Sequence, residues 1–182
     1  MDGSELFLKA GTALNFETKT AYAVAVSARD PLLPGSTPVS AVFTLAVGDV
    51  NEPPTALALA NIVTSLAENS NTTSRIKVAD IAISDDALGS NVISLAGADA
   101  SSFEVIGTEL FLKAGTALDF ETKAAYAVTV SASDTALPGS TPVSAAFTLT
   151  VGDVNEPPTA LALSNTVSSI AENTSTSSRI KV

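Results

Sequence analysis

Oxygen-bearing side chains gather in short loop phrases of this chain, and their types and spacing could do chemistry. Within residues 53–156 they lie in the phrases LAEN, ISDD, LDFE, SASD and DVNE. These side chains are Glu68, Asp85, Asp86, Asp119, Glu121, Asp134, Asp153, Asn155 and Glu156. Calcium takes roughly six to eight oxygen ligands, mostly carboxylates and carbonyls from flexible segments. The pattern therefore favours a calcium site assembled from several loops, because the carboxylates would otherwise repel one another.

The composition argues against most enzyme chemistry and against several kinds of partner. The chain has no cysteine and no histidine, which removes disulfides, thiolate metal sites, the usual zinc ligand and the usual general base. Its 19 acidic and 9 basic residues give a net charge of −10, which opposes binding to nucleic acid and to anionic lipid. No apolar run approaches the roughly 20 residues of a membrane-spanning helix. We therefore expect a cation-binding protein that is not an enzyme, does not bind nucleic acid and does not itself insert into a membrane.

The segments that must position these side chains belong to a sequence repeat. Residues 3–78 align without a gap on residues 107–182, an offset of 104 positions, and about 60 of the 76 aligned positions are identical. Residues 79–106 occur only once. The sequence therefore divides into the C-terminal part of an incomplete unit, one complete unit, and the N-terminal part of a further incomplete unit. These are residues 1–52, 53–156 and 157–182.

The local periodicity of the unit is two, which predicts β-strands. In YAVTVSASD, Tyr126, Val128 and Val130 share one face, and the residues between them share the other. The apolar phase of RIKVADIAI shifts by an odd step between Val78 and Ile81, which predicts a β-bulge or a crossing between sheets. About seven short strands per unit, with no helical stretch between them, predict an all-β protein made of immunoglobulin-like Greek-key β-sandwiches in tandem. We place Tyr126 and its repeat counterpart Tyr22 in the core or at its rim.

The order of the acidic motifs resembles that of the cadherin repeats, and in particular of bacterial cadherin-like repeats. The matching residues are, in order, Glu68, Asp85 with Gly89 and Asn91, Leu118 to Glu121, Ala132 to Asp134, and Asp153 to Glu156. The resemblance implies a β-sandwich of cadherin type with calcium (Ca2+) bound between consecutive repeats. Ala87 replaces an acidic residue of the family's loop motif, and Pro157 replaces an asparagine of its linker motif. Because each replacement loses an oxygen ligand, we expect fewer or weaker ions than is usual in the family.

The resemblance implies two calcium junctions in this chain. The first would use Asn15, Glu17, Asp49, Asn51, Glu52, Asp85 and Asp134. The second would use Glu68, Asp119, Glu121, Asp153, Asn155 and Glu156, and its remaining ligands would lie beyond Val182. Asn15 stands where the complete unit has Asp119, so the first junction has one formal negative charge fewer at that position.

The incomplete units suggest an assembly between chains. By the cadherin strand order, residues 1–52 supply the last three strands of a sandwich and residues 157–182 supply the first ones. We hypothesise that the C-terminal strands of one chain complete the N-terminal fragment of another, as a strand-exchanged dimer or a head-to-tail assembly. This would bring Glu172 and Asp30 into the incomplete calcium sites. The competing expectation is that both fragments are disordered or proteolysed around one folded unit.

Three functions are compatible with the sequence. The first, which we favour, is an extracellular or cell-surface adhesion repeat of a larger secreted protein, in which calcium stiffens a rod and like cadherin repeats are the partners. The second is a carbohydrate-binding module with a polysaccharide partner, for which 5% aromatic residues and no tryptophan offer few stacking platforms. The third is an enzyme with a carboxylate pair such as Asp119 and Glu121, but no substrate cleft is suggested.

Overall fold

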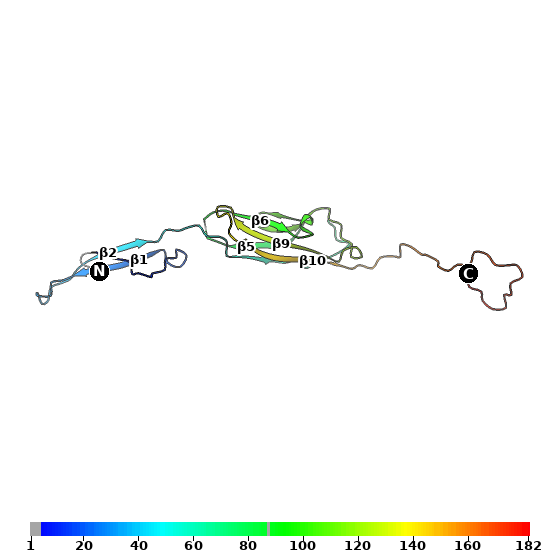
Figure 1. The fold of residues 1–182 in the computed structure, drawn as a ribbon, viewed down its shortest axis with the longest axis horizontal. Coiled ribbons are helices and arrows are strands. Elements are labelled where there is room, and N and C mark those ends of the chain that lie inside the picture. Colours follow the sequence, from blue (N-terminus) through cyan, green and yellow to red (C-terminus); the bar gives the residue numbers. More distant parts are fainter. Residues whose placement is uncertain (1–4, 87) are drawn as a thin grey trace.

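The structure, a computed structural model, describes residues 5–86 and 88–182 and is strongly elongated (Figure 1). A β-hairpin lies at one end of the long axis, a β-sandwich lies in the middle, and residues 157–182 extend from the other end of the sandwich. The hairpin consists of β1 (Ala21–Ala28) and β2 (Val39–Ala46), paired antiparallel. Residues 157–182 form turns but no strand.

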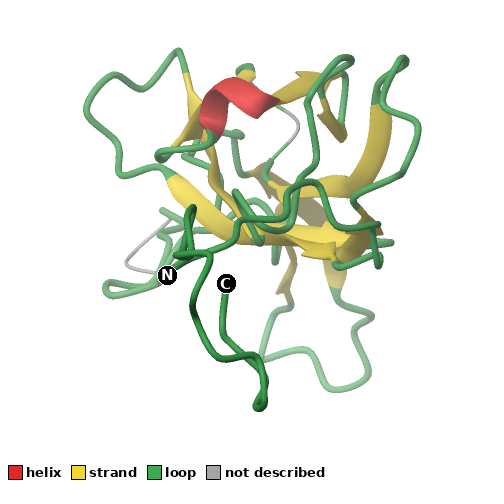
Figure 2. Ribbon diagram, turned by 90° about the vertical axis from the view of Figure 1, so that its right-hand side faces the viewer, coloured by secondary structure: helices red, strands yellow, loops and turns green. Residues whose placement is uncertain are grey.

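The sandwich contains eight strands in two sheets, and Figure 2 looks at it along the long axis of the chain. Its strands are β3 (Ala56–Ala60), β4 (Ser65–Ala67), β5 (Ile76–Ser84), β6 (Asn91–Ala96), β7 (Phe103–Ile106), β8 (Glu109–Leu112), β9 (Ala125–Asp134) and β10 (Val143–Gly152). One sheet has the order β4-β10-β9-β6, and the other has the order β3-β5-β8-β7. The one helical element among the described residues is the single 3₁₀ turn η1 (Ala100–Ser102). The predicted all-β sandwich is therefore confirmed.

The core lies between the two sheets and follows the alternation seen in the sequence. Val128 and Val130 of β9 point inward and are buried, whereas Thr129 between them is not. The other sheet contributes the buried Leu110 of β8. Phe103 and Phe147 meet edge to face across the core, with ring centroids 5.7 Å apart, and so join the two sheets. Burial of each such large apolar side chain stabilises the sandwich by about 1.5–3 kcal/mol.

The predicted irregularity in RIKVADIAI is a β-bulge in β5. The pairing of β5 with β8 shifts register between Lys77 and Ala79. Val78 and Ala79 are consecutive and both fully buried, which a regular strand with one core face does not allow. The shift of apolar phase in the sequence is therefore explained by the extra residue of the bulge.

The number of strands is one higher than the sequence suggests, because the first strand is split. β3 belongs to one sheet and β4 to the other, so the chain crosses between the sheets at residues 61–64. Asn61 has a φ of 48° at the end of β3, and its side-chain amide donates to Asp80 Oδ2 at 2.6 Å. Asparagine tolerates this left-handed conformation better than most residues, so it can turn the chain out of the first sheet.

The two tyrosines occupy equivalent positions with different burial. Tyr126 is buried in β9, and its hydroxyl donates to Ala117 O at 2.8 Å. Tyr22 of β1 is half-buried and makes the equivalent bond to Ala13 O at 3.1 Å. The prediction of a core or rim position is confirmed for Tyr126, whereas Tyr22 lies on the hairpin, outside the core of the sandwich. Among the described residues, no helix is long and apolar enough to cross a membrane.

Candidate metal centres at the two junctions

The first junction is formed by the linker between β2 and β3 and the end of the sandwich that faces it. Strand geometry brings three side chains together at this end. Asn91, the first residue of β6, is the register partner of Asp134, the last residue of β9. The Asn91 amide also donates to Oδ2 of Asp85, just after β5, at 2.5 Å. Asp49 and Asn51 come from the linker.

Five oxygen atoms of this junction are buried without a hydrogen-bond partner among the described residues. They are Asp49 Oδ1, Asn51 Oδ1, Asp85 Oδ1, Asn91 Oδ1 and Asp134 Oδ2. Leaving a buried polar group unpaired costs about 1–3 kcal/mol, and more when the group is charged. Asp134 Oδ2 and Asn51 Oδ1 lie beside the same point, at Gly89, and carboxylate and amide oxygens are the donor set that calcium prefers. The residues present therefore fit a calcium ion.

Asp134 is held so that one of its oxygens is free to take a ligand. Its side chain is only 3% exposed. Oδ1 accepts the backbone N–H of Ala136 at 2.7 Å and that of Ser90 at 3.4 Å, whereas Oδ2 accepts none. The Ala136 bond is the main reason that the pKa of Asp134 is lowered, so the carboxylate stays ionised although it is buried.

Gly89 allows the linker and the sandwich to approach each other closely. It has a φ of +74°, and a Cβ at this position would collide with both Asp134 Oδ2 and Asn51 Oδ1. These two oxygens therefore meet over the glycine, one from the end of β9 and the other from the linker. Only glycine leaves this space open to the two oxygens and, between them, to an ion.

A second group of acids lies on the hairpin side of the first junction. One carboxylate oxygen from each of Glu17, Asp49 and Glu52 lies within 4.8 Å of the others. Loss of part of its hydration to neighbouring atoms, a hydrogen bond with Asp86 and the negative charges of neighbouring acids raise the pKa of Glu52, although its side chain is exposed. Such a raised pKa is expected of carboxylates that lie close together.

Asp86 and Asn15 act mainly through backbone contacts. Asp86 accepts the N–H of Glu52 and that of Leu88, both at 2.8 Å, and so ties the linker to the loop after β5. These bonds, led by that from Glu52, lower the pKa of Asp86. Asn15 Oδ1 accepts the N–H of Thr18 at 2.7 Å and closes a turn next to the cleft of the first junction.

The second junction is the opposite end of the sandwich. Glu68, Glu121, Asp153 and Glu156 each offer an oxygen within 4.8 Å of the others. Glu68 organises the group, since its two oxygens accept the N–H of Phe120 at 2.9 Å and that of Val154 at 2.6 Å. These bonds, that of Phe120 first, lower the pKa of Glu68.

The remaining acids of the second junction differ in how they are engaged. Loss of part of its hydration to neighbouring atoms, followed by the negative charge of Glu68, raises the pKa of Glu156, although its side chain is exposed. Asp119 accepts the N–H of Thr122 at 2.8 Å and closes a turn, and Asn155 is exposed. None of these oxygens is both buried and unpaired among the described residues, which distinguishes the second junction from the first.

Each junction contains only part of the acid set that the repeat provides. The first junction has the repeat counterparts of three acids of the second: Glu17, Asp49 and Glu52 correspond to Glu121, Asp153 and Glu156. The fourth acid of the second junction, Glu68, has its counterpart in Glu172, which is exposed and lies in residues 157–182. Asp30, the counterpart of Asp134, is exposed near the far end of the hairpin, where its Oδ1 accepts the N–H of Leu32 at 2.9 Å. Within one chain, neither Glu172 nor Asp30 joins either acid cluster.

Two residues at the first junction have a role that the sequence did not assign. Asn91 supplies a buried, unpaired oxygen, and Gly89 leaves space beside the oxygens of Asp134 and Asn51. Both were part of the cadherin-like loop motif, so the Gly-x-Asn spacing was the signal that could have identified them. The replaced position of that motif, Ala87, lies outside the described residues.

Comparisons with known proteins agree on the fold. No protein-family model matches the chain, and no curated protein matches it. The chain is similar to the solved extracellular cadherin domains 3–6 of protocadherin gamma B2, with 26% identity and a TM-score of 0.57 over 80% of this chain. It is also similar to the cis-dimer structure of protocadherin gamma B7 EC3–6, with 25% identity and a TM-score of 0.55 over 79% of this chain.

A third similar structure is human mucin-like protocadherin EC1–2, with 18% identity and a TM-score of 0.57. The match covers 85% of this chain and 76% of that one. This chain spans only about a third of the gamma B2 and gamma B7 structures, at 34% and 33% of their lengths. The fold is therefore a cadherin-type β-sandwich, and the resemblance to cadherin repeats that the sequence suggested is confirmed at the level of the fold.

Proposed function

We propose that this chain is a calcium-binding, cadherin-like repeat of an extracellular or cell-surface protein, and that calcium stiffens its junctions into a rod used for adhesion. The observation that carries the proposal is the group of five buried oxygens without hydrogen-bond partners at the first junction. They come from both the linker and the sandwich, so a shared ion would join these two parts of the chain. We further propose that the role is not enzymatic and that like repeats are the partners.

Calcium would be held mainly by Asp49 and Asn51 of the linker and by Asp85, Asn91 and Asp134 of the sandwich. Glu17 and Glu52 would bind on the hairpin side. When bound, the ion supplies positive charge that neutralises the crowded carboxylates and fixes the linker against the sandwich. The chain's own contribution is to bury the oxygens, to keep Asp134 ionised and to leave space at Gly89.

The second junction would bind calcium more weakly in a single chain. Its four acids, Glu68, Glu121, Asp153 and Glu156, approach one another, but no group from a following repeat faces them in the described residues. Exposed carboxylates pay less for staying unpaired, because water solvates them. We therefore expect one site of higher affinity at the first junction and one of lower affinity at the second.

The test is unfolding of the 182-residue chain in calcium, in EDTA and in magnesium. A ligand that binds only the native state stabilises it by about 2.7 kcal/mol at a hundredfold excess over its dissociation constant. We expect a calcium-specific rise in Tm that Asp85→Asn reduces and that Glu104→Gln, a charge removal on β7 away from both junctions, leaves intact. No rise at millimolar calcium would refute the proposal and bring the carbohydrate-binding alternative forward.

A further inference from the structure

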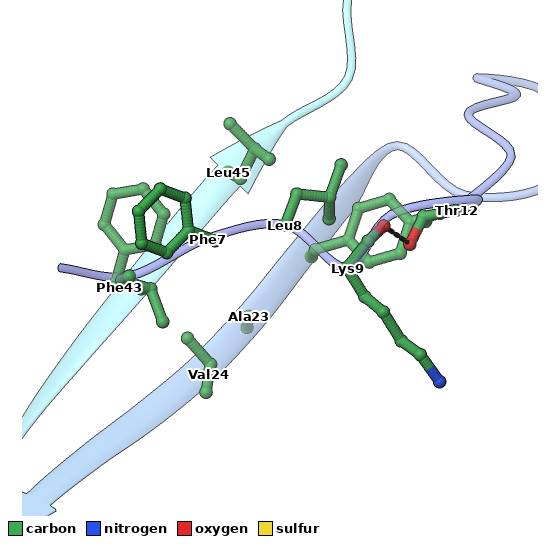
Figure 3. Close-up of a pocket in the computed structure, with 10 residues that line it drawn as sticks. Phe7, Leu8, Lys9, Thr12, Ala23, Val24, Phe43 and Leu45 are labelled. Carbon is green, nitrogen blue, oxygen red and sulfur yellow. Dashed lines mark hydrogen bonds between the residues drawn. The ribbon is translucent and has the colours of Figure 1, made fainter. Parts of the chain in front are cut away.

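The linker between β2 and β3 consists of a free part and a part that is attached to the sandwich. Figure 3 shows Leu45 near the end of β2, in the apolar groove of the hairpin that it lines with Phe43. Beyond the hairpin, residues 48–50 make no backbone–backbone hydrogen bond with any part of the chain that the structure describes, and Val50 is 68% exposed. Residues 51–55, by contrast, contact the sandwich through hydrogen bonds and burial.

Asp86, in the loop between β5 and β6, makes the central contact with the attached part. Its Oδ2 accepts the N–H of Glu52 at 2.8 Å and so joins residues 34 positions apart in the sequence. Its Oδ1 accepts the N–H of Leu88, also at 2.8 Å, which fixes the carboxylate within its own loop. Hydrogen bonds to a charged acceptor are roughly twice as strong as those between neutral groups. Asp86 therefore ties the linker to the sandwich by a bond that needs no metal ion.

Three further features hold the same stretch of the linker. Thr55 donates both its backbone N–H and its hydroxyl to Ser84 O, the last residue of β5, at 2.8 Å and 3.1 Å. Pro54 is buried although the residues on either side of it are exposed. Asn51 lies so close to the sandwich that a Cβ at Gly89 would collide with its Oδ1. Residues 51–55 are thus held by contacts within the chain itself.

The neighbours Asp85 and Asp86 differ in how their oxygens are used. Asp85 Oδ1 is buried and has no hydrogen-bond partner among the described residues, as is expected of a metal ligand in the absence of its ion. Both oxygens of Asp86 accept backbone N–H groups. Asp86 was a candidate ligand in the sequence, but its contacts favour a role in placing the linker.

We propose that Asp86 is a positioning residue that docks residues 51–55 on the sandwich independently of calcium, so that the calcium-free chain bends at residues 48–50. The docked linker holds Asn51 beside Asp134 before an ion binds. Pro53 and Pro54 then belong to the sandwich and not to the hinge.

The docked linker would also prepare the calcium site. The apparent affinity for a ligand rises with the fraction of molecules in which its site is already formed. Calcium would restrain the hinge itself through Asp49, the acidic residue of the free part, whose Oδ1 is buried and unpaired among the described residues. These two consequences rest on the proposed calcium function, whereas the docking by Asp86 does not.

Amide hydrogen exchange of the 182-residue chain in EDTA, followed residue by residue by NMR, tests the docking. Glu52 and Thr55 should be protected, because their N–H groups are hydrogen-bonded to the sandwich. Val50 should exchange at the rate of an unstructured peptide. If Glu52 exchanges as fast as an unstructured peptide, the linker is not docked without calcium and the proposal is wrong.

Asp86→Ala and Asp85→Ala are a matched pair, since each removes one carboxylate from the same loop. In EDTA, Asp86→Ala should speed the exchange of the Glu52 amide at least about tenfold, the equivalent of about 1.4 kcal/mol, which is within reach of a hydrogen bond to a charged group. Thr55 should stay protected, which shows that the variant is folded. Asp85→Ala should leave Glu52 protected, because Asp85 bonds Asn91 of β6 and not the linker. Equal exchange of Glu52 in the two variants would overturn the role of Asp86.

Calcium titration of the same variants by isothermal calorimetry separates positioning from ligation. Asp86→Ala should bind as many ions per chain as the parent, with a Kd raised by no more than about the factor by which docking is weakened. A smaller number of bound ions would identify Asp86 as a ligand and overturn its positioning role.

The two proposals fail in different ways. Protection of Glu52 in EDTA, in a parent chain that binds no calcium, would support the docking and refute the proposed calcium function. Calcium binding by a parent chain whose Glu52 amide is unprotected in EDTA would support the calcium function and refute the docking.

Discussion

Gly89→Ala separates the calcium site from the stability of the sandwich. Gly89 has a φ of +74°, a conformation that costs an L-residue about 1–2 kcal/mol. A Cβ at this position would also collide with Asp134 Oδ2 and Asn51 Oδ1, two of the five buried oxygens without partners. The substitution should therefore weaken folding moderately and displace two calcium ligands.

Gly115→Ala is the matched control for this experiment. Gly115 has a φ of +77°, but a Cβ there would meet nothing within 4 Å. In EDTA, Gly115→Ala should lose about 1–2 kcal/mol of the free energy of unfolding through backbone strain, and Gly89→Ala should lose more, because its Cβ also collides with Asp134 and Asn51. At a calcium concentration a hundredfold above the dissociation constant, the parent chain and Gly115→Ala should gain about 2.7 kcal/mol, and Gly89→Ala should gain little.

The assay is urea unfolding at fixed calcium and in EDTA, followed by circular dichroism, for the parent chain and both variants. The quantity compared is the calcium-dependent increase in the free energy of unfolding, so the strain common to both substitutions cancels. If Gly89→Ala and Gly115→Ala show the same increase, the oxygens beside Gly89 do not hold calcium and our reading of the first junction is wrong.

Three further outcomes follow from the structure. Desolvation and neighbouring negative charges raise the pKa of Glu52 above 4.5. Without calcium, the free energy of unfolding should therefore fall as the pH rises through this raised pKa, because the carboxylate becomes charged among other acids. Glu52→Gln should flatten that part of the plot of unfolding free energy against pH. Leu149→Ala, at a fully buried position, should cost about 2–5 kcal/mol in urea unfolding, whereas Leu45→Ala should leave the unfolding of the sandwich nearly unchanged. Glu68→Gln should lower the Tm more at pH 7 than at pH 3. Hydrogen bonds from two backbone N–H groups favour the ionised carboxylate of Glu68 and lower its pKa. The stabilisation by this carboxylate is therefore lost as the pH falls through the lowered pKa.

The sequence by itself determined the strands, the repeat and the kind of site. Period-two alternation is a property of neighbouring residues, so Val128 and Val130 could be placed on one face without knowing what they pack against. The bulge near Val78 was visible for the same reason, as a break in that alternation. The order of the acidic motifs was enough to suggest a cadherin-type sandwich, a fold that the comparisons confirm. The function of those acids as calcium ligands stays a prediction.

Only the tertiary structure decided which oxygens meet and which surfaces stay open. Asn51 and Asp134 come together at Gly89 because the linker passes close to the end of β9, a long-range contact that no local pattern encodes. The nearly identical environments in sequence of Phe43 and Phe147 do not predict that one is half exposed and the other buried. Burial depends on whether strands distant in the sequence cover a side chain, so two copies of the same phrase can fold alike locally and still differ in burial.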